Sequence, residues 1–147
     1  MTSPVDVTVE IEIGAAPADV AAVMFDPQRE PQWMQAITGV ELIDAALAPG
    51  ARVRRRASVL GKDVGWTTEV ERVMFPHLLV LRVTDGPFTG TIKYEIQRSA
   101  GGSHVTIHNV GQPTGPSFIP AAMIAAPMKT ALTADLGRLK ALVESGK

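Results

Sequence analysis

Between Gly39 and Val110 the sequence reads as six strand-like segments separated by short turn signals, and this succession constrains the fold more than any other feature. The breaks contain glycine and proline, as in APG at 48–50 and DGP at 85–87. Connections this short join antiparallel neighbours, so the segments predict one antiparallel sheet. We expect its strands near 40–46, 51–60, 63–74, 77–84, 88–98 and 103–110.

A further strand and two short helices are predicted before this region. Valine and isoleucine alternate with polar residues from Val5 to Ile13, which is the period of a half-buried strand. Apolar residues then recur at helical spacing over 18–25. A second short helix is expected over 31–37, and acids near these helices are expected to cap them or to be solvated.

The C-terminal segment changes period from two to 3.6. One apolar stripe is formed by Leu132, Leu136, Leu139 and Val143, which predicts a long amphipathic helix. Pro127 is expected either to kink this helix or to start it afresh.

The order of these elements predicts an α+β fold in one domain spanning residues 1–147. The chain has neither an internal repeat nor a linker-like tract, and 147 residues suffice for one buried core. Six to seven twisted antiparallel strands curl, so a curved sheet around a long helix would leave a space between the two.

Four stretches of this chain resemble the START-like, or SRPBCC, superfamily, which includes polyketide cyclases/dehydrases and lipid-transfer proteins. The stretches are IEIGAAPADVAAVMFDPQREPQWMQAITGVELI, APGARVRRR, GGSHVTI and LTADLGRLKALVE, in that order along nearly the whole chain. The resemblance implies a helix-grip fold, with an apolar cavity between sheet and helix. Because members of the superfamily bind lipids or polyketides and some catalyse cyclisation or dehydration, function must be argued from the site.

Strand alternation predicts which side chains face that cavity. The predicted inner face is mostly apolar and carries a few polar groups, which is typical of a small-molecule site. Methionines on the helix would complete the lining, since they adapt to varied apolar shapes. The predicted ligand-binding residues are Arg55, Trp66, Thr68, Phe88, Tyr94, Asn109, Met123 and Met128.

Most of these residues also have a structural interpretation. Trp66 and Tyr94 are typical core residues, and Asn109 could bond to turn backbone. Arg55 needs a partner, because a buried unpaired guanidinium is costly. It could pair with Glu69 or Glu71, extend to the cavity rim or contact a ligand.

The basic stretch RVRRRAS, at 52–58, suggests at first a polyanion-binding patch. In a strand, however, Arg52, Arg54 and Arg56 share the outer face, where Glu69 or Glu71 could pair with them. The formal net charge is only −1, so the chain as a whole has no field that attracts nucleic acid. We therefore expect no nucleic-acid partner.

Metal and cofactor chemistry are not expected. The sequence contains no cysteine, which excludes thiolate catalysis and sulfur-ligated metals. His104 and His108 point outward and lie about 13 Å apart on one strand, so they cannot share a metal ion. The sequence also lacks a signal-peptide pattern and a membrane-spanning run, so a cytoplasmic protein is expected.

Three functions are compatible with this pattern. The first is binding of a hydrophobic small molecule in the cavity. The second is polyketide cyclisation or dehydration, in which Arg55 would stabilise an enolate and Tyr94 would transfer a proton. No inward-facing acid or histidine is predicted to act as a general base. The third is a protein-interaction module. Separately, segment 111–118 could form a gate through which a ligand enters the cavity.

Overall fold

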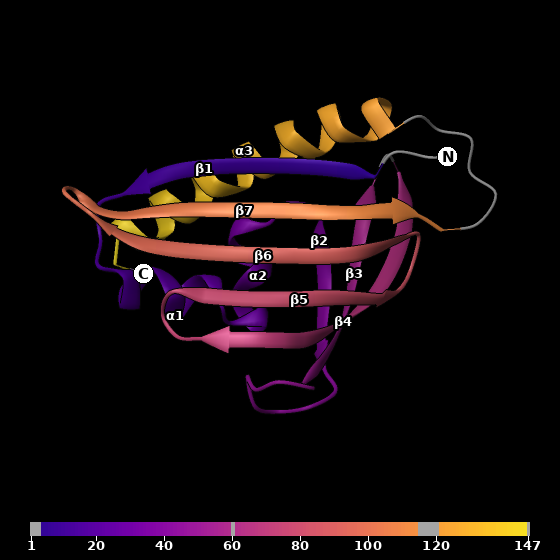
Figure 1. The fold of residues 1–147 in the computed structure, drawn as a ribbon, viewed down its shortest axis with the longest axis horizontal. Helices are drawn as coiled ribbons and strands as arrows, with labels where there is room; N and C mark the ends of the chain where they lie inside the picture. Colours follow the sequence, from indigo (N-terminus) through magenta and orange to yellow (C-terminus); the bar gives the residue numbers. More distant parts are fainter. Residues whose placement is uncertain (1–3, 60, 115–120, 147) are drawn as a thin grey trace.

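A computed structural model describes residues 4–59, 61–114 and 121–146. Seven strands form one antiparallel sheet, in the order β1-β7-β6-β5-β4-β3-β2. The α-helices of the described residues lie on one face of this sheet, with the long α3 crossing behind β1 and β7 (Figure 1). The elements are β1 (Val5–Ile13), α1 (Pro17–Met24), the 3-10 helix η1 (Pro27–Arg29), α2 (Glu30–Trp33), β2 (Ile37–Leu42), β3 (Arg52–Val59), β4 (Lys62–Met74), β5 (Leu78–Asp85), β6 (Phe88–Ser99), β7 (Gly102–Pro113) and α3 (Ala121–Glu144).

This architecture confirms the predicted α+β helix-grip fold. Each strand from β2 to β7 pairs with its sequence neighbour, as the short turns require. The exception is β1, which pairs along its whole length with β7, from Val5 opposite Gly111 to Ile13 opposite Ser103. Two strands that lie far apart in the sequence, β1 and β7, are therefore brought together at one edge of the sheet.

The core lies between the inner face of the sheet and the helices. The predicted stripe on α3 is confirmed, because Leu132, Leu136 and Leu139 are buried and Val143 packs against them. Pro127 stands inside α3 and does not start a new helix. Its side chain is exposed, and a proline near the N-terminal end leaves most of the helical hydrogen bonds intact.

Two predicted elements were misplaced. The second short helix covers only Glu30–Trp33, because Met34 is already extended and Ile37 starts β2 opposite Ala57. Strand β2 covers Ile37–Leu42 rather than 40–46. The residues from Ile43 to Ala51 form a loop instead, and part of the predicted gate at 111–118 lies outside the described residues.

Candidate functional site

The inner face of the sheet is sealed at one end and partly accessible at the other. On β6, Tyr94 and Ile96 are buried, whereas Phe88 and Ile92 on the same face are half-buried. Trp66 on β4 is half-buried too, and it packs beside the β5–β6 turn at Gly86. The accessible inner face is therefore the end of the sheet near that turn, where a small molecule could reach apolar side chains.

Arg55 is the most strongly bound polar residue of this face. Its guanidinium donates two hydrogen bonds to Glu30, from Nε to Oε1 at 2.7 Å and from Nη2 to Oε2 at 2.8 Å. A third hydrogen bond runs from Nη1 to the hydroxyl of buried Thr68. Both charged side chains are almost fully enclosed, with 6% of Arg55 and 4% of Glu30 exposed.

Glu30 corrects the expectation that acids near the short helices would cap them or be solvated. Neither Glu69 nor Glu71 is the partner of Arg55, because the buried end of α2 brings Glu30 onto the inner face instead. Burial disfavours the charge on Arg55, but the hydrogen bonds and the negative charge of Glu30 outweigh it and raise the pKa of Arg55. The Arg55 guanidinium therefore stays charged, and its hydrogen bonds to Glu30 and Thr68 anchor α2 to β3 and β4.

Tyr94 lies deep in the interior among aromatic rings. Its ring stacks with Phe25 at 6.4 Å between centroids and meets Trp33 edge-on at 6.2 Å. Burial is the main reason why the pKa of Tyr94 is raised, and the nearby charge of Glu30 adds to the effect. The phenol accordingly stays protonated and can act only as a neutral hydrogen-bonding group.

A second buried acid, Asp135 on α3, was also missed by sequence reasoning. It accepts hydrogen bonds from the Arg138 guanidinium and from the backbone N–H of Gln35 at 3.3 Å. Arg138 in turn donates to the carbonyl of Trp33 at 3.1 Å, so the cluster ties α2 to α3. The expectation that no acid faces inward was wrong. Glu30 comes from a helix too short to show which of its sides is buried, and Asp135 comes from a helix with a polar side, on which an acid gives no sign that it is buried.

Asn109 lies on the accessible part of the inner face, in phase with buried Val105 and Ile107. Its amide nitrogen lies 3.9 Å from the Met128 sulfur on α3, so the side chain points at the helix. Its Oδ1 is buried and has no hydrogen-bond partner among the described residues. Nε1 of Trp33 is likewise buried and has no hydrogen-bond partner among the described residues.

The structure brings most of the predicted binding residues onto one face. Met128 packs against the core from the helix side, as does Ile124, and Phe88 packs against it from the sheet. Met123 does not fit the prediction, because it is 66% exposed and lies on the solvent side of α3. On this part of α3 the next residue, Ile124, packs against the core instead.

The outer-face arginines Arg52 and Arg54 are paired with acids, although not with the predicted ones. Arg52 pairs with Asp44 at 3.1 Å, and Arg54 pairs with Asp85 at 3.0 Å. Glu69 pairs with Arg82 instead. These partners come from loop and strand ends whose positions depend on the turns, and they neutralise much of the basic stretch.

His104 and His108 point away from the interior, as predicted, and contact neighbouring acids. His104 contacts Glu12 at 2.9 Å and Glu10 at 3.3 Å, and His108 contacts Asp6 at 2.8 Å. His77 contacts the carbonyl of Ile96 at 2.8 Å. Within the described residues, no group of three or more acids and histidines could hold a metal ion.

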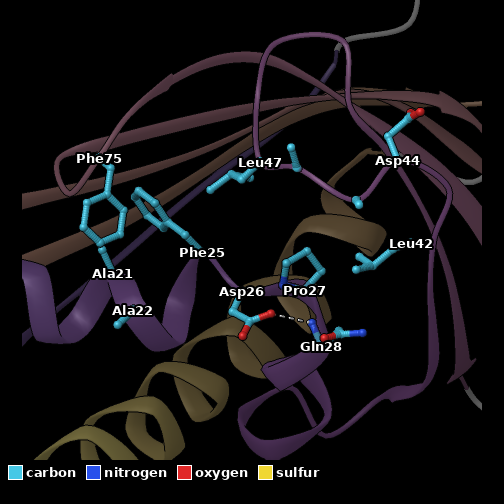
Figure 2. A pocket seen from close by; sticks show the side chains of 12 residues that line it. Ala21, Ala22, Phe25, Asp26, Pro27, Gln28, Leu42, Asp44, Leu47 and Phe75 are labelled. Carbon is cyan, nitrogen blue, oxygen red and sulfur yellow. Dashed lines mark hydrogen bonds between the residues drawn. The ribbon is translucent and has the colours of Figure 1, made fainter.

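A separate concavity of about 280 Å³ lies outside the sheet–α3 interface, between α1, η1 and the 43–51 loop (Figure 2). Phe25, Pro27, Leu47 and Phe75 contribute to its walls, together with several alanines. Phe25 also forms part of the core, so this residue separates the concavity from Tyr94.

The sequence of this chain matches a known protein family. The family model described as polyketide cyclase / dehydrase and lipid transport matches residues 4–144, which is almost the whole chain. The chain belongs to this family. The predicted resemblance to START-like, or SRPBCC, proteins is thereby confirmed. Among curated proteins, none matches the sequence significantly.

Solved structures share the same fold at low sequence identity. The crystal structure of TTHA0849 from Thermus thermophilus covers 97% of this chain and 99% of its own, with a TM-score of 0.83 and 20% identity. A START superfamily protein from Mycobacterium smegmatis covers 98% and 99%, with a TM-score of 0.80 and 17% identity. A protein of unknown function from Staphylococcus aureus, SA2116, covers 98% and 96%, with a TM-score of 0.78 and 12% identity. These likenesses establish the fold alone.

Membership in the polyketide cyclase / dehydrase and lipid transport family is consistent with an apolar inner face that carries few polar groups. The family description covers both catalysis and transport, so the geometry of this chain has to distinguish them. In the described part of the chain, no helix has the length and apolar character needed to cross a membrane.

Proposed function

We propose that this chain is a single START-like domain that binds a hydrophobic small molecule, a lipid or polyketide, between the inner face of the sheet and α3. The ligand would occupy the accessible end of the face, against Trp66, Phe88 and Asn109. The rings of Trp66 and Phe88 are only half-buried, whereas Tyr94 and Ile96, further along β6, are buried in the core. Binding there would remove the remaining apolar surface from water. This contributes roughly 25 cal/mol of favourable free energy for each Å² of apolar surface that is buried.

The observation that carries this proposal is the orphaned oxygen of Asn109. A buried carbonyl without a hydrogen bond costs about 1–3 kcal/mol, and buried polar groups are therefore almost always paired. Oδ1 of Asn109 is such a group among the described residues, and the side chain points toward Met128 across the sheet–helix interface. A ligand with a hydroxyl group would supply the missing donor. We therefore infer an apolar ligand that carries at least one hydroxyl.

Binding is favoured over polyketide catalysis because Arg55, one of the two proposed catalytic groups, is already engaged. The Arg55 guanidinium donates to both oxygens of Glu30 and to Thr68, so it is not free to stabilise an enolate. Glu30, the charged group with the largest effect on the pKa of Tyr94, is held in the same ion pair. Freeing either group would leave the other as an unpaired buried charge, which is strongly unfavourable.

The first test is native mass spectrometry of freshly purified protein, which should reveal a bound hydrophobic molecule that organic extraction releases. The second compares 1-decanol with decyl methyl ether by calorimetric titration. The alcohol should bind more tightly by about 1 kcal/mol, the net value of one hydrogen bond. Asn109→Leu should abolish this preference, because the acceptor is gone.

A matched control is Thr106→Val, which alters the opposite face of the same strand. This variant should keep the preference for the alcohol. Equal binding of the alcohol and the ether by the unaltered protein would refute the role of Asn109. Absence of any bound molecule together with no binding of either probe would refute the proposed function.

A further inference from the structure

The concavity in Figure 2 is a candidate for a second binding site, distinct from the sheet–α3 interface. It encloses about 280 Å³ between α1, η1, the 43–51 loop and the β4–β5 turn at Phe75. Four alanines, two from α1 and two from the loop, line it, and their small side chains leave the space open. A dry cavity of about 150 Å³ already binds benzene when its walls are apolar, so this one has room for a bicyclic ring.

The two acids of this pocket do not call for a charged ligand. Asp26 accepts a hydrogen bond from the backbone N–H of Gln28 at 3.0 Å, which caps η1. Asp44 accepts hydrogen bonds from the backbone N–H and from Nε of Arg52, at 2.9 and 3.1 Å. Both carboxylates are thus used by the protein itself. The chemistry of the remaining wall favours an uncharged, apolar occupant.

Large apolar side chains are unusually exposed around this pocket. Among the described residues five large hydrophobic side chains are exposed, and four of them stand on the 43–51 loop or at the end of β4 and in the turn that follows it. These four are between 39% and 56% exposed: Ile43, Leu47, Met74 and Phe75. Apolar groups clustered in this way mark a binding surface, because their exposure otherwise gains the fold nothing.

Aromatic rings lead inward from the pocket. Phe75 meets Phe25 edge-on, with centroids 6.0 Å apart at 84°, and Phe25 stacks on Tyr94 from the other side. Another ring placed in the pocket would extend this series, and aromatic pairs stabilise each other beyond the area they bury. We propose that the pocket bordered by Phe25, Leu47 and Phe75 binds a small, neutral, planar aromatic molecule of about two fused rings. This site does not depend on the ligand proposed for the sheet–α3 interface.

The alanine lining allows a direct test with naphthalene as the probe. The ring current of a bound aromatic molecule shifts nearby methyl resonances, so the protein labelled at alanine methyl groups is titrated with naphthalene. The shifts should be confined to the lining alanines, and the exposed alanines of α3 should not move. The lining alanines are Ala21, Ala22, Ala45 and Ala46.

A matched pair of variants separates pocket binding from unspecific binding. Ala22→Leu fills the pocket from α1 and should abolish the shifts, whereas Ala18→Leu, at an exposed position of the same helix outside the lining, should leave them unchanged. Leucine is a good helix former, so neither change should unfold α1. Ala46→Leu fills the pocket from the loop side and should act like Ala22→Leu without touching a helix.

Other occupants of this surface are outcomes that would overturn the proposal. Concentration-dependent dimerisation that Phe75→Ser abolishes, with no naphthalene shifts, would assign the surface to a second copy. Sedimentation with phosphatidylcholine vesicles, lost in Phe75→Ser and again without naphthalene shifts, would assign it to a lipid surface. Naphthalene shifts that persist in Ala22→Leu but vanish in Asn109→Leu would place the probe at the inner face instead. A failure of the alcohol preference at Asn109 would leave this test unaffected.

Discussion

The buried Glu30–Arg55 pair offers the sharpest test of the interior, through the substitution Glu30→Gln. Glutamine keeps the shape of glutamate but removes its charge, so the guanidinium of Arg55 would be left buried without a counter-ion. The two side chains are only 4% and 6% exposed, which keeps water from replacing the lost carboxylate. Breaking a buried pair in this way costs about 3–5 kcal/mol. That is a large share of the roughly 5–15 kcal/mol that stabilises a typical domain.

Urea denaturation followed by tryptophan fluorescence would measure this loss. Trp33 is completely buried in the same short helix as Glu30, so its emission should report the detachment of α2. The matched control is Glu69→Gln, which breaks the surface pair with Arg82 and should cost less than about 1 kcal/mol. The double substitution Glu30→Leu with Arg55→Met should recover most of the stability, because an apolar pair carries no desolvation penalty.

Two outcomes would contradict this reasoning. A loss in Glu30→Gln no larger than that in Glu69→Gln would mean that solvent reaches Arg55 and screens its charge. A double variant as unstable as Glu30→Gln would mean that the damage comes from altered packing rather than from the unpaired charge.

Further predictions concern backbone contacts and pH. Gly137→Ala should raise the free energy of unfolding by about 0.5–1 kcal/mol, because a Cβ at this exposed position in α3 meets nothing within 4 Å and alanine favours the helix. Gly111→Ala should instead lower the free energy of unfolding by more than about 1 kcal/mol in the same urea assay, since the added Cβ would lie 2.2 Å from the Thr89 carbonyl oxygen. Equal stability of the two variants would refute this prediction. The hydrogen bond with Glu12, followed by the one with Glu10, raises the pKa of His104 above 6.5. Its protonation therefore stabilises the fold fully below pH 6.5, and this contribution should disappear as the pH rises through the folded-state pKa. NMR titration of the imidazole would check the direction, and His104→Gln should remove this part of the pH dependence.

Local periodicity was enough to predict the strands, apart from the bounds of β2, and the two faces of β3. Alternation along β3 placed Arg55 inward and Arg52, Arg54 and Arg56 outward, and the turns placed consecutive strands side by side. These features depend on residues close in sequence, whose side chains must alternate across a pleated sheet. The same logic placed the stripe on α3 correctly, because one face of a helix recurs every 3.6 residues.

Partners across the interior could not be predicted in this way. Glu30 lies in a helix of four residues, which is too short to show a period, so nothing local indicated that its carboxylate would be buried. Asp135 and the pocket beside Phe25 depend likewise on how α2, α3 and the 43–51 loop pack.

The sequence by itself thus determined the order of elements, the sheet and the inward direction of Arg55. Only the tertiary structure decided that Arg55 meets Glu30, that Asn109 keeps an unpaired oxygen against α3 and that Phe25 faces a second pocket. The physical reason is one of range. The period of a strand or helix is a property of neighbouring residues, whereas an ion pair, an orphaned acceptor or a pocket arises where segments distant in sequence come into contact.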